Sequence, residues 1–116
     1  MESIQPEVLR SAIKEVWIRA LTEVQPDVLN ALVKARAEET NPRGQQYLDI
    51  LIENAKKAKE NRIVICQDTG VPTFFVKTSL SFPFTGDIRA EFDGALRDLT
   101  KKEFPMRPMV VHPLTR

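Results

Sequence analysis

The sequence predicts an α+β fold, in which a helical N-terminal half packs on a small mixed sheet. Three stretches with helical spacing of apolar residues come first, and a stretch with alternating apolar residues follows between residues 74 and 82. The composition, with 42% hydrophobic and 28% charged residues, is that of an ordinary globular protein. The 116 residues are enough for one domain spanning residues 1–116.

Three helices are expected in the N-terminal half. The first spans about residues 6–24, because its apolar residues recur at spacings of three and four. The second begins at Pro26, where the missing N–H of proline costs nothing, and fades near Glu38-Glu39. The third follows the cap residue Asn41 and ends near Asn61.

After the third helix the period of the apolar residues changes to two. Alternate residues of an extended segment share one face, which predicts a long strand with these residues on one side: Phe74, Val76, Thr78, Leu80 and Phe82. Gly86-Asp87 ends this strand and caps a fourth helix, which has apolar residues spaced for one buried face from Ile88 to Leu99 and which Phe104-Pro105 stops. The small sheet is expected from the segments around Ile63, Phe74 and Val110.

The pentapeptide Cys66-Gln67-Asp68-Thr69-Gly70 places a thiol, an amide, a carboxyl group and a hydroxyl in one short loop. The apolar run Ile63-Val64-Ile65 leads into it, so the loop follows a predicted strand. From the residues alone two interpretations stand. Cysteine is often a small buried hydrophobe, and Asx and hydroxyl side chains before glycine commonly form a turn. Alternatively, polar groups held at the end of a strand form a chemical site.

The order Ile-Cys-Gln-Asp-Thr-Gly-Val-Pro, followed by Met106-Arg107 and by Val111 to Arg116, resembles the N-terminal part of class I, iron-sulfur-dependent fumarate hydratases and the related tartrate dehydratases. The resemblance covers essentially the whole chain. It implies a hydro-lyase that interconverts fumarate and L-malate, a step of the tricarboxylic acid cycle. The close alternative is a tartrate dehydratase, which removes water from tartrate to give oxaloacetate.

The resemblance also implies roles for individual residues. Cys66 matches the first of three cysteines that hold a 4Fe-4S cluster, so two further cysteines are needed beyond the single one here. Gln67 and Asp68 match positions that face the substrate, and Asp68 is the expected catalytic residue for proton transfer. Arg107 matches an arginine that binds a substrate carboxylate, although Pro108-Met109 departs from the small or polar residues usual in the family.

Members of the resembled family use a longer catalytic chain or alpha subunit and a beta subunit or domain. We therefore expect the chain to be an N-terminal fragment or a split subunit of the alpha region, with the downstream alpha region and a beta portion as partners. The expected substrate is a small dicarboxylic acid, and the chain alone is expected to be inactive. We also expect an oligomer, because apolar surface that meets the rest of the enzyme is otherwise exposed.

Charge and cysteine content limit the other function classes. The net charge of +1 predicts no preference for nucleic acid or for membranes, and no apolar run approaches the roughly 20 residues that cross a bilayer. One cysteine and no signal-like segment favour the reducing cytoplasm. A competing interpretation is a non-catalytic docking module, in which the first three helices bind a partner and the pentapeptide is only a turn.

Overall fold

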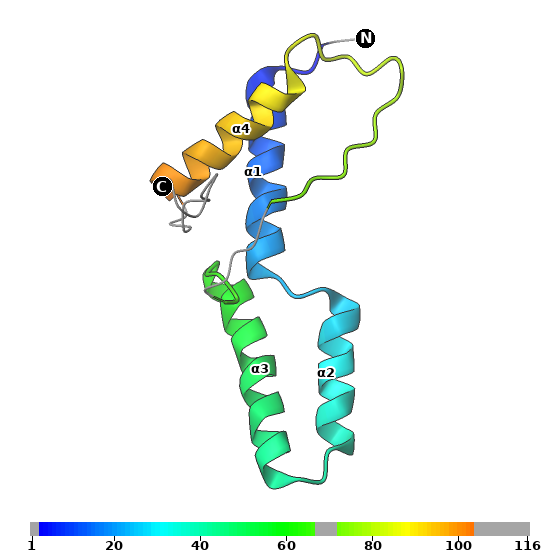
Figure 1. The fold of residues 1–116 in the computed structure, drawn as a ribbon, viewed down its shortest axis with the longest axis vertical. Helices are drawn as coiled ribbons and strands as arrows, with labels where there is room; N and C mark the ends of the chain where they lie inside the picture. Colours follow the sequence, from blue (N-terminus) through cyan, green and yellow to red (C-terminus); the bar gives the residue numbers. More distant parts are fainter. Residues whose placement is uncertain (1–2, 67–71, 104–116) are drawn as a thin grey trace, which may run out of the picture. The chain divides into compact units, whose positions relative to one another are not determined.

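The computed structural model describes residues 3–66 and 72–103, and its regular structure there is helical (Figure 1). The elements are four α-helices and a terminal π-helical turn: α1 (Pro6–Thr22), α2 (Pro26–Glu38), α3 (Pro42–Asn61), α4 (Ile88–Asp98) and η1 (Leu99–Glu103). The chain divides into two compact units, and the boundary between them falls within α1. The first unit comprises Met1–Val16 and Asp68–Arg116, and the second comprises Trp17–Gln67.

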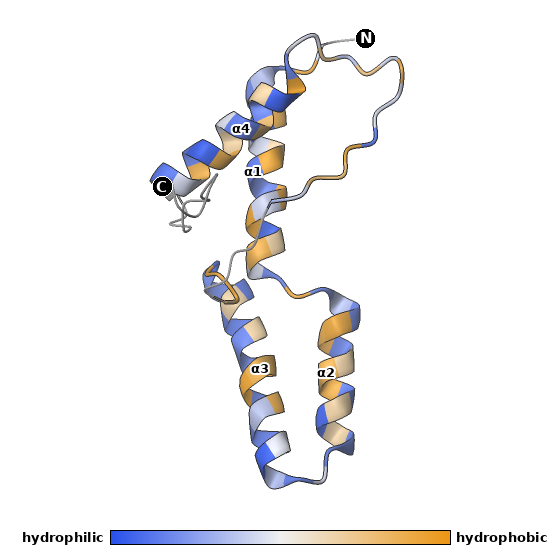
Figure 2. Cartoon of the chain, viewed as in Figure 1, coloured by the Kyte–Doolittle hydropathy of each residue, from blue (hydrophilic) through white to orange (hydrophobic). Residues whose placement is uncertain are grey.

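In the second unit, α2 and α3 form an antiparallel hairpin with hydrophobic residues along both helices (Figure 2). The Arg36 guanidinium lies 2.7 Å from the Asp49 carboxylate and so joins the helices, and the hydrogen bond to Asp49 raises the pKa of Arg36. Asn41 caps α3 as expected, since its side-chain oxygen accepts from the backbone N–H groups of Arg43 and Gly44. Ala55 is buried on the same helix.

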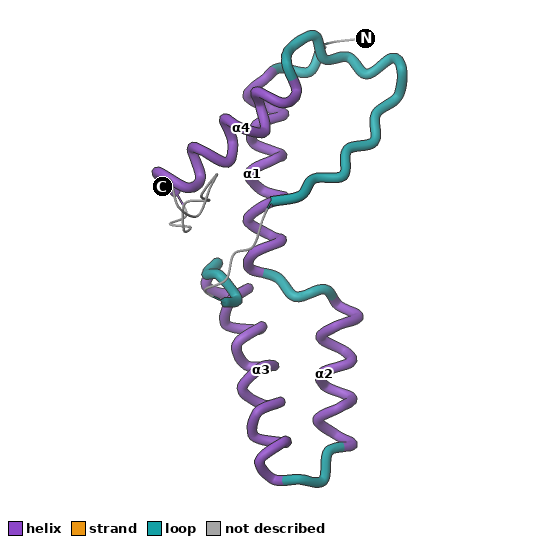
Figure 3. Tube along the Cα trace, viewed as in Figure 1, coloured by secondary structure: helices purple, strands orange, loops and turns teal. Residues whose placement is uncertain are grey.

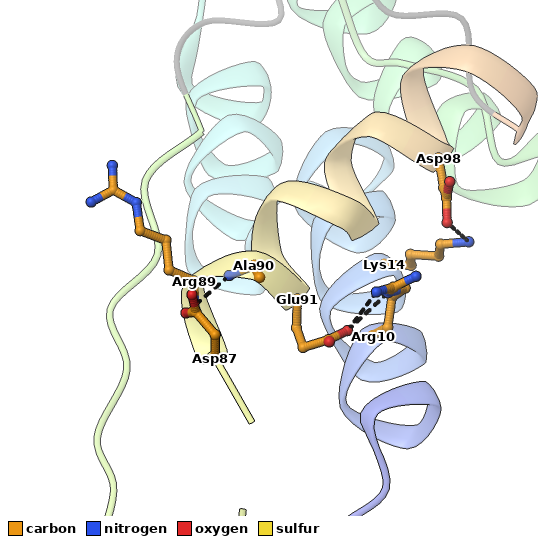
Figure 4. A network of polar contacts seen from close by, with 7 residues as sticks. All are labelled: Arg10, Lys14, Asp87, Arg89, Ala90, Glu91 and Asp98. Atoms are coloured by element: carbon orange, nitrogen blue, oxygen red, sulfur yellow. Dashed lines mark hydrogen bonds and ion pairs between the residues drawn. The ribbon is translucent and has the colours of Figure 1, made fainter. Parts of the chain in front are cut away.

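In the first unit, the N-terminal part of α1 lies against α4 (Figure 4). Both Arg10 Nε and Arg10 Nη2 lie 2.9 Å from the same carboxylate oxygen of Glu91, and Lys14 lies 3.6 Å from Asp98. The expected cap of α4 is confirmed, because the Asp87 carboxylate accepts from the N–H groups of residues 89 and 90 (Figure 4). Opposite charges thus line the contact between the two helices.

The core of the first unit includes Ile13 on α1, Ala95 on α4 and Leu99 at the start of η1. Leu99 is the largest of the described side chains to be fully buried. The turn η1 continues α4 as a π-helix, in which backbone hydrogen bonds join residues five positions apart. The hydroxyl of Thr100, near this junction, donates a hydrogen bond to the Leu96 carbonyl at 2.8 Å. The junction between α4 and η1 therefore lies at a buried leucine.

The expected α+β fold is wrong for the part of the chain that the structure describes. Residues 3–66 and 72–103 contain no strand, and the segment expected as a strand over residues 74–82 is loop (Figure 3). The Phe74 ring packs on Phe92 of α4, with centroids 4.6 Å apart, but Phe75 is 96% exposed and Leu80 is also exposed. Alternation specifies an extended backbone, whereas a strand also needs a neighbour that shares its hydrogen bonds.

That neighbour is missing from the described residues. Residues 75–78 make no backbone hydrogen bond there, and the chain around Ile63 is held by helices instead. The third expected sheet segment, around Val110, lies outside the described residues. All four predicted helices are present, and the first three end within about two residues of the expected positions. The fourth was expected to continue to Phe104-Pro105, but α4 ends at Asp98 and the π-helical turn η1 follows it to Glu103. Among the described helices, none combines the length and the apolar character needed to cross a bilayer.

Candidate functional site

The candidate site begins where α3 ends. Arg62 follows the helix in the left-handed conformation, with φ 51° and ψ 47°, and its backbone N–H donates to the carbonyls of Ala58 and Lys59. The N–H of Ile63 also donates to Ala58, at 3.0 Å. This pattern is the Schellman motif, which satisfies the last carbonyls of a helix and turns the chain sharply away from it. The direction in which the chain leaves α3 toward Cys66 is therefore set at Arg62.

Ile65, the residue before Cys66, is held by hydrogen bonds on both sides of its backbone. Its N–H donates to the carbonyl of Leu21 in α1 at 3.0 Å. Its carbonyl accepts from the side-chain amide of Asn54 in α3 at 2.8 Å. All of these residues belong to the second unit. We call these two hydrogen bonds the Ile65 clamp; they fix the backbone one residue before Cys66, whose side chain is exposed.

Charged side chains join the same two helices close to the clamp. Glu23, just after α1, lies 3.1 Å from Lys59 on α3 and 3.5 Å from Arg19 on α1. The hydrogen bond from Lys59 is the largest influence on the Glu23 carboxyl group, and it lowers the pKa of Glu23 below its ordinary value of 4.5. These contacts connect the end of α1 to α3 and so support the backbone that Ile65 bonds to.

Among the described residues, Cys66 can supply one thiolate ligand to a metal cluster. An exposed thiol on a fixed backbone suits iron-sulfur ligation, which uses cysteine thiolates. However, the described part of the chain holds no group of three or more His, Cys, Asp or Glu side chains placed to bind a metal ion. The other predicted site residues, Gln67, Asp68 and Arg107, lie outside the described residues.

A separate hollow of about 260 Å³ lies in the first unit. It is lined by three residues of α1, by Phe92 of α4 and by residues 74–77. Lys77 is the one charged side chain in this lining, and the other lining side chains are apolar. A dicarboxylate is bound by several charged or hydrogen-bonding donors, so this hollow does not have the chemistry of a dicarboxylate site.

Comparison with known proteins identifies the family. The sequence model of the family described as fumarate hydratase (Fumerase) matches residues 10–116. The chain belongs to this family. The resemblance inferred from the pentapeptide and from the segment after Arg107 is thereby confirmed, and the match includes Cys66 and the clamp that precedes it. Fumarate hydratases are hydro-lyases, which places the chain in a family of hydro-lyase type.

Three relatives show how much of such proteins the chain represents. A protein of Methanocaldococcus jannaschii provisionally named L(+)-tartrate dehydratase subunit alpha is 34% identical over 93% of the chain and 38% of the relative. A provisionally named class I fumarate hydratase of Geobacillus stearothermophilus is 33% identical over 94% of the chain and 21% of the relative. The L(+)-tartrate dehydratase subunit alpha of Escherichia coli K12 is 31% identical over 74% and 28%, respectively. The chain thus spans well under half of these relatives.

Sequence reasoning located Cys66 but missed the residues that hold it. Asn54 lies within an apolar helical pattern, where asparagine is a poor helix former, and that mismatch was the available signal. Arg62 gave no signal, because glycine and asparagine are the usual residues at this left-handed position. Leu21 contributes only its backbone carbonyl, which no side-chain pattern reveals.

Proposed function

We propose that the chain forms the N-terminal part of the alpha region of an iron-sulfur-dependent hydro-lyase that interconverts fumarate and L-malate. The observation that carries the proposal is the family match over residues 10–116, which includes a single exposed cysteine on a clamped backbone. A reducing compartment such as the cytoplasm suits this function, because a thiolate ligand has to remain reduced.

In this proposal Cys66 supplies one thiolate ligand of a 4Fe-4S cluster. When bound, such a cluster supplies a Lewis-acidic iron that polarises the substrate's oxygen atoms. The sequence has one cysteine, so two further cysteine ligands come from another region of the enzyme. The contribution of this chain is to present the sulfur on a backbone that the Ile65 clamp holds in place.

Three further residues complete the proposed contribution to the pocket, and they rest on the motif alone. The Gln67 amide donates a hydrogen bond to a substrate carboxylate, and the Asp68 carboxyl group assists proton transfer. The Arg107 guanidinium binds a carboxylate through two parallel hydrogen bonds. Together they recognise both the charge and the hydroxyl chemistry of a small dicarboxylic acid.

Tartrate is the second candidate substrate. The relatives from M. jannaschii and E. coli carry the name of tartrate dehydratase alpha subunits, with identities similar to that of the relative named as a fumarate hydratase. A subunit named alpha implies a partner, so we propose a beta subunit or domain, together with the downstream alpha region, as partners of this chain. The assembled enzyme is then an oligomer.

The test is an anaerobic assay with fumarate and with L(+)-tartrate, on the chain co-expressed with a downstream alpha region and a beta portion. We expect activity on one of the two acids and loss of both activity and bound iron in Cys66→Ser. The purified 116-residue chain alone is the control and is expected to be inactive. Full activity and iron content in Cys66→Ser would contradict the ligand assignment and favour the docking-module interpretation. Turnover by the chain alone would contradict the proposal that the other regions of the enzyme are needed for activity.

A further inference from the structure

We propose that Asn54 is a positioning residue that holds Cys66 in the place from which its sulfur serves as a metal ligand. The inference rests on the proposed function, since it gives the Ile65 clamp a purpose. It starts from the 2.8 Å hydrogen bond between the Asn54 side-chain amide and the Ile65 carbonyl. That bond joins the middle of α3 to the residue immediately before the cysteine.

The geometry of the peptide bond transmits this hydrogen bond to Cys66. The Ile65 carbonyl and the Cys66 nitrogen belong to one planar unit, which also contains the Cα atoms of both residues. Fixing the carbonyl therefore fixes the plane, and with it the Cα atom that carries the Cys66 side chain. The second bond of the clamp, from the Ile65 N–H to Leu21, fixes the preceding plane as well. The backbone approaching Cys66 is thus held at two successive peptide units.

The choice of residue at position 54 supports a role outside the helix. Asparagine is less favourable than alanine in a helix interior, so an exposed position there gains nothing from it unless the side chain has a partner elsewhere. Asn61 on the same helix provides the contrast. Its amide donates to the Lys57 carbonyl of α3 itself, at 2.9 Å, and so stays within the helix. Only Asn54 of these two reaches toward the cysteine.

A positioned ligand is useful because the other ligands come from a different region of the enzyme. Groups that hydrogen-bond a metal ligand directly typically change metal affinity by roughly 10- to 100-fold when they are removed, and Asn54, which acts through the neighbouring carbonyl, is expected to have a smaller effect. A cysteine on a mobile loop loses conformational freedom when it binds a metal, whereas a clamped one has already lost it. The clamp therefore favours ligation without touching the metal.

The first experiment uses the 116-residue chain, in which Cys66 is the single cysteine and so takes up a nitroxide label at one site. Three variants are compared with the unchanged sequence: Asn54→Ala, Asn54→Asp and Asn61→Ala. Aspartate keeps the shape of asparagine but, when ionised, has no hydrogen to donate. We expect a more mobile nitroxide spectrum and about two- to tenfold faster amide exchange at Ile65 in both Asn54 variants, as for the loss of one hydrogen bond. Asn61→Ala, the matched control, is expected to leave both unchanged.

The second experiment measures iron content and cluster absorbance of the assembled, anaerobically reconstituted enzyme. We expect lower iron retention in Asn54→Ala and Asn54→Asp than in Asn61→Ala. An unchanged nitroxide spectrum and unchanged exchange in the Asn54 variants would overturn the positioning role, as would equal changes in all three variants. Full iron content in Cys66→Ser overturns the proposed function instead, and it leaves the nitroxide and exchange results as a separate measure of the clamp.

Discussion

Leu99→Ala is expected to lower the free energy of unfolding of the first unit by about 3 kcal/mol, as estimated from typical costs of emptying a buried leucine site. Leu99 is 0% exposed. Removing three carbons costs about 2.4 kcal/mol at roughly 0.8 kcal/mol for each buried methylene, and the cavity left behind adds to it. The assay is urea unfolding of the 116-residue chain, followed by far-ultraviolet circular dichroism.

Leu80→Ala is the matched control, because the same side chain is exposed there. We expect a change within about 0.5 kcal/mol, as for a surface position. Equal destabilisation by the two substitutions would refute the reasoning, since it would show that Leu80 is buried. The loop assignment of residues 72–82 would then be wrong as well, and the alternating pattern would again indicate a strand with one covered face.

Three other predictions concern caps and charges. Asp87→Ala removes the cap of α4 and is expected to cost about 1 kcal/mol in thermal unfolding, whereas Asp93→Ala on the exposed side of α4 is expected to cost little. Arg62→Gly should raise the melting temperature and Arg62→Val should lower it, because φ is 51° there and a β-branched residue is strained in that region. Because the pKa of Glu23 is lowered, its contribution to stability is present above pH 4.5 and is lost as the pH falls through the folded-state pKa. Lys59→Gln should raise the pKa of Glu23, which an NMR titration measures. An unchanged titration would show that Lys59 is not its partner.

The helices were predictable because their signals are local. Spacing of three and four residues defines each apolar face, and the starts are marked by proline at the first turn of α2 and α3 and by the capping side chains Asn41 and Asp87. Each of these signals acts within about one helical turn of where it stands. Nothing distant in the chain is needed to interpret it, so the bounds of α2 and α3 agree closely with the expected ones.

The sheet failed because its signal is only half local. Alternation between Phe74 and Phe82 describes an extended backbone, but pairing depends on a second segment that the pattern does not name. In the structure the Phe74 ring packs against Phe92 of α4, so its contact is with a helix and not with another strand. The apolar run before Cys66 was likewise assigned to a strand, whereas Ile65 bonds to α1 and to Asn54.

The sequence motif of the candidate site could be predicted, but the structure around it could not. Cys66 stood out by its chemistry and its order among neighbours, and it lies within the residues that the family model matches. The clamp that holds it depends on a side chain 11 positions earlier and on the Leu21 carbonyl, and neither relation follows from spacing. Predicting the clamp would require the path of the chain after Arg62. That path depends on a left-handed backbone conformation at Arg62, where glycine is the usual residue.

The two units also differ in how far along the chain their contacts reach, and this bears on the order of folding. Arg36 and Asp49 are 13 positions apart, whereas Arg10 and Glu91 are 81 positions apart. Closing the longer loop costs more entropy and is slower. The α2–α3 hairpin is therefore expected to form before the first turns of α1 meet α4. The Asn54–Ile65 bond of the clamp, which spans 11 positions, belongs with these short-range contacts.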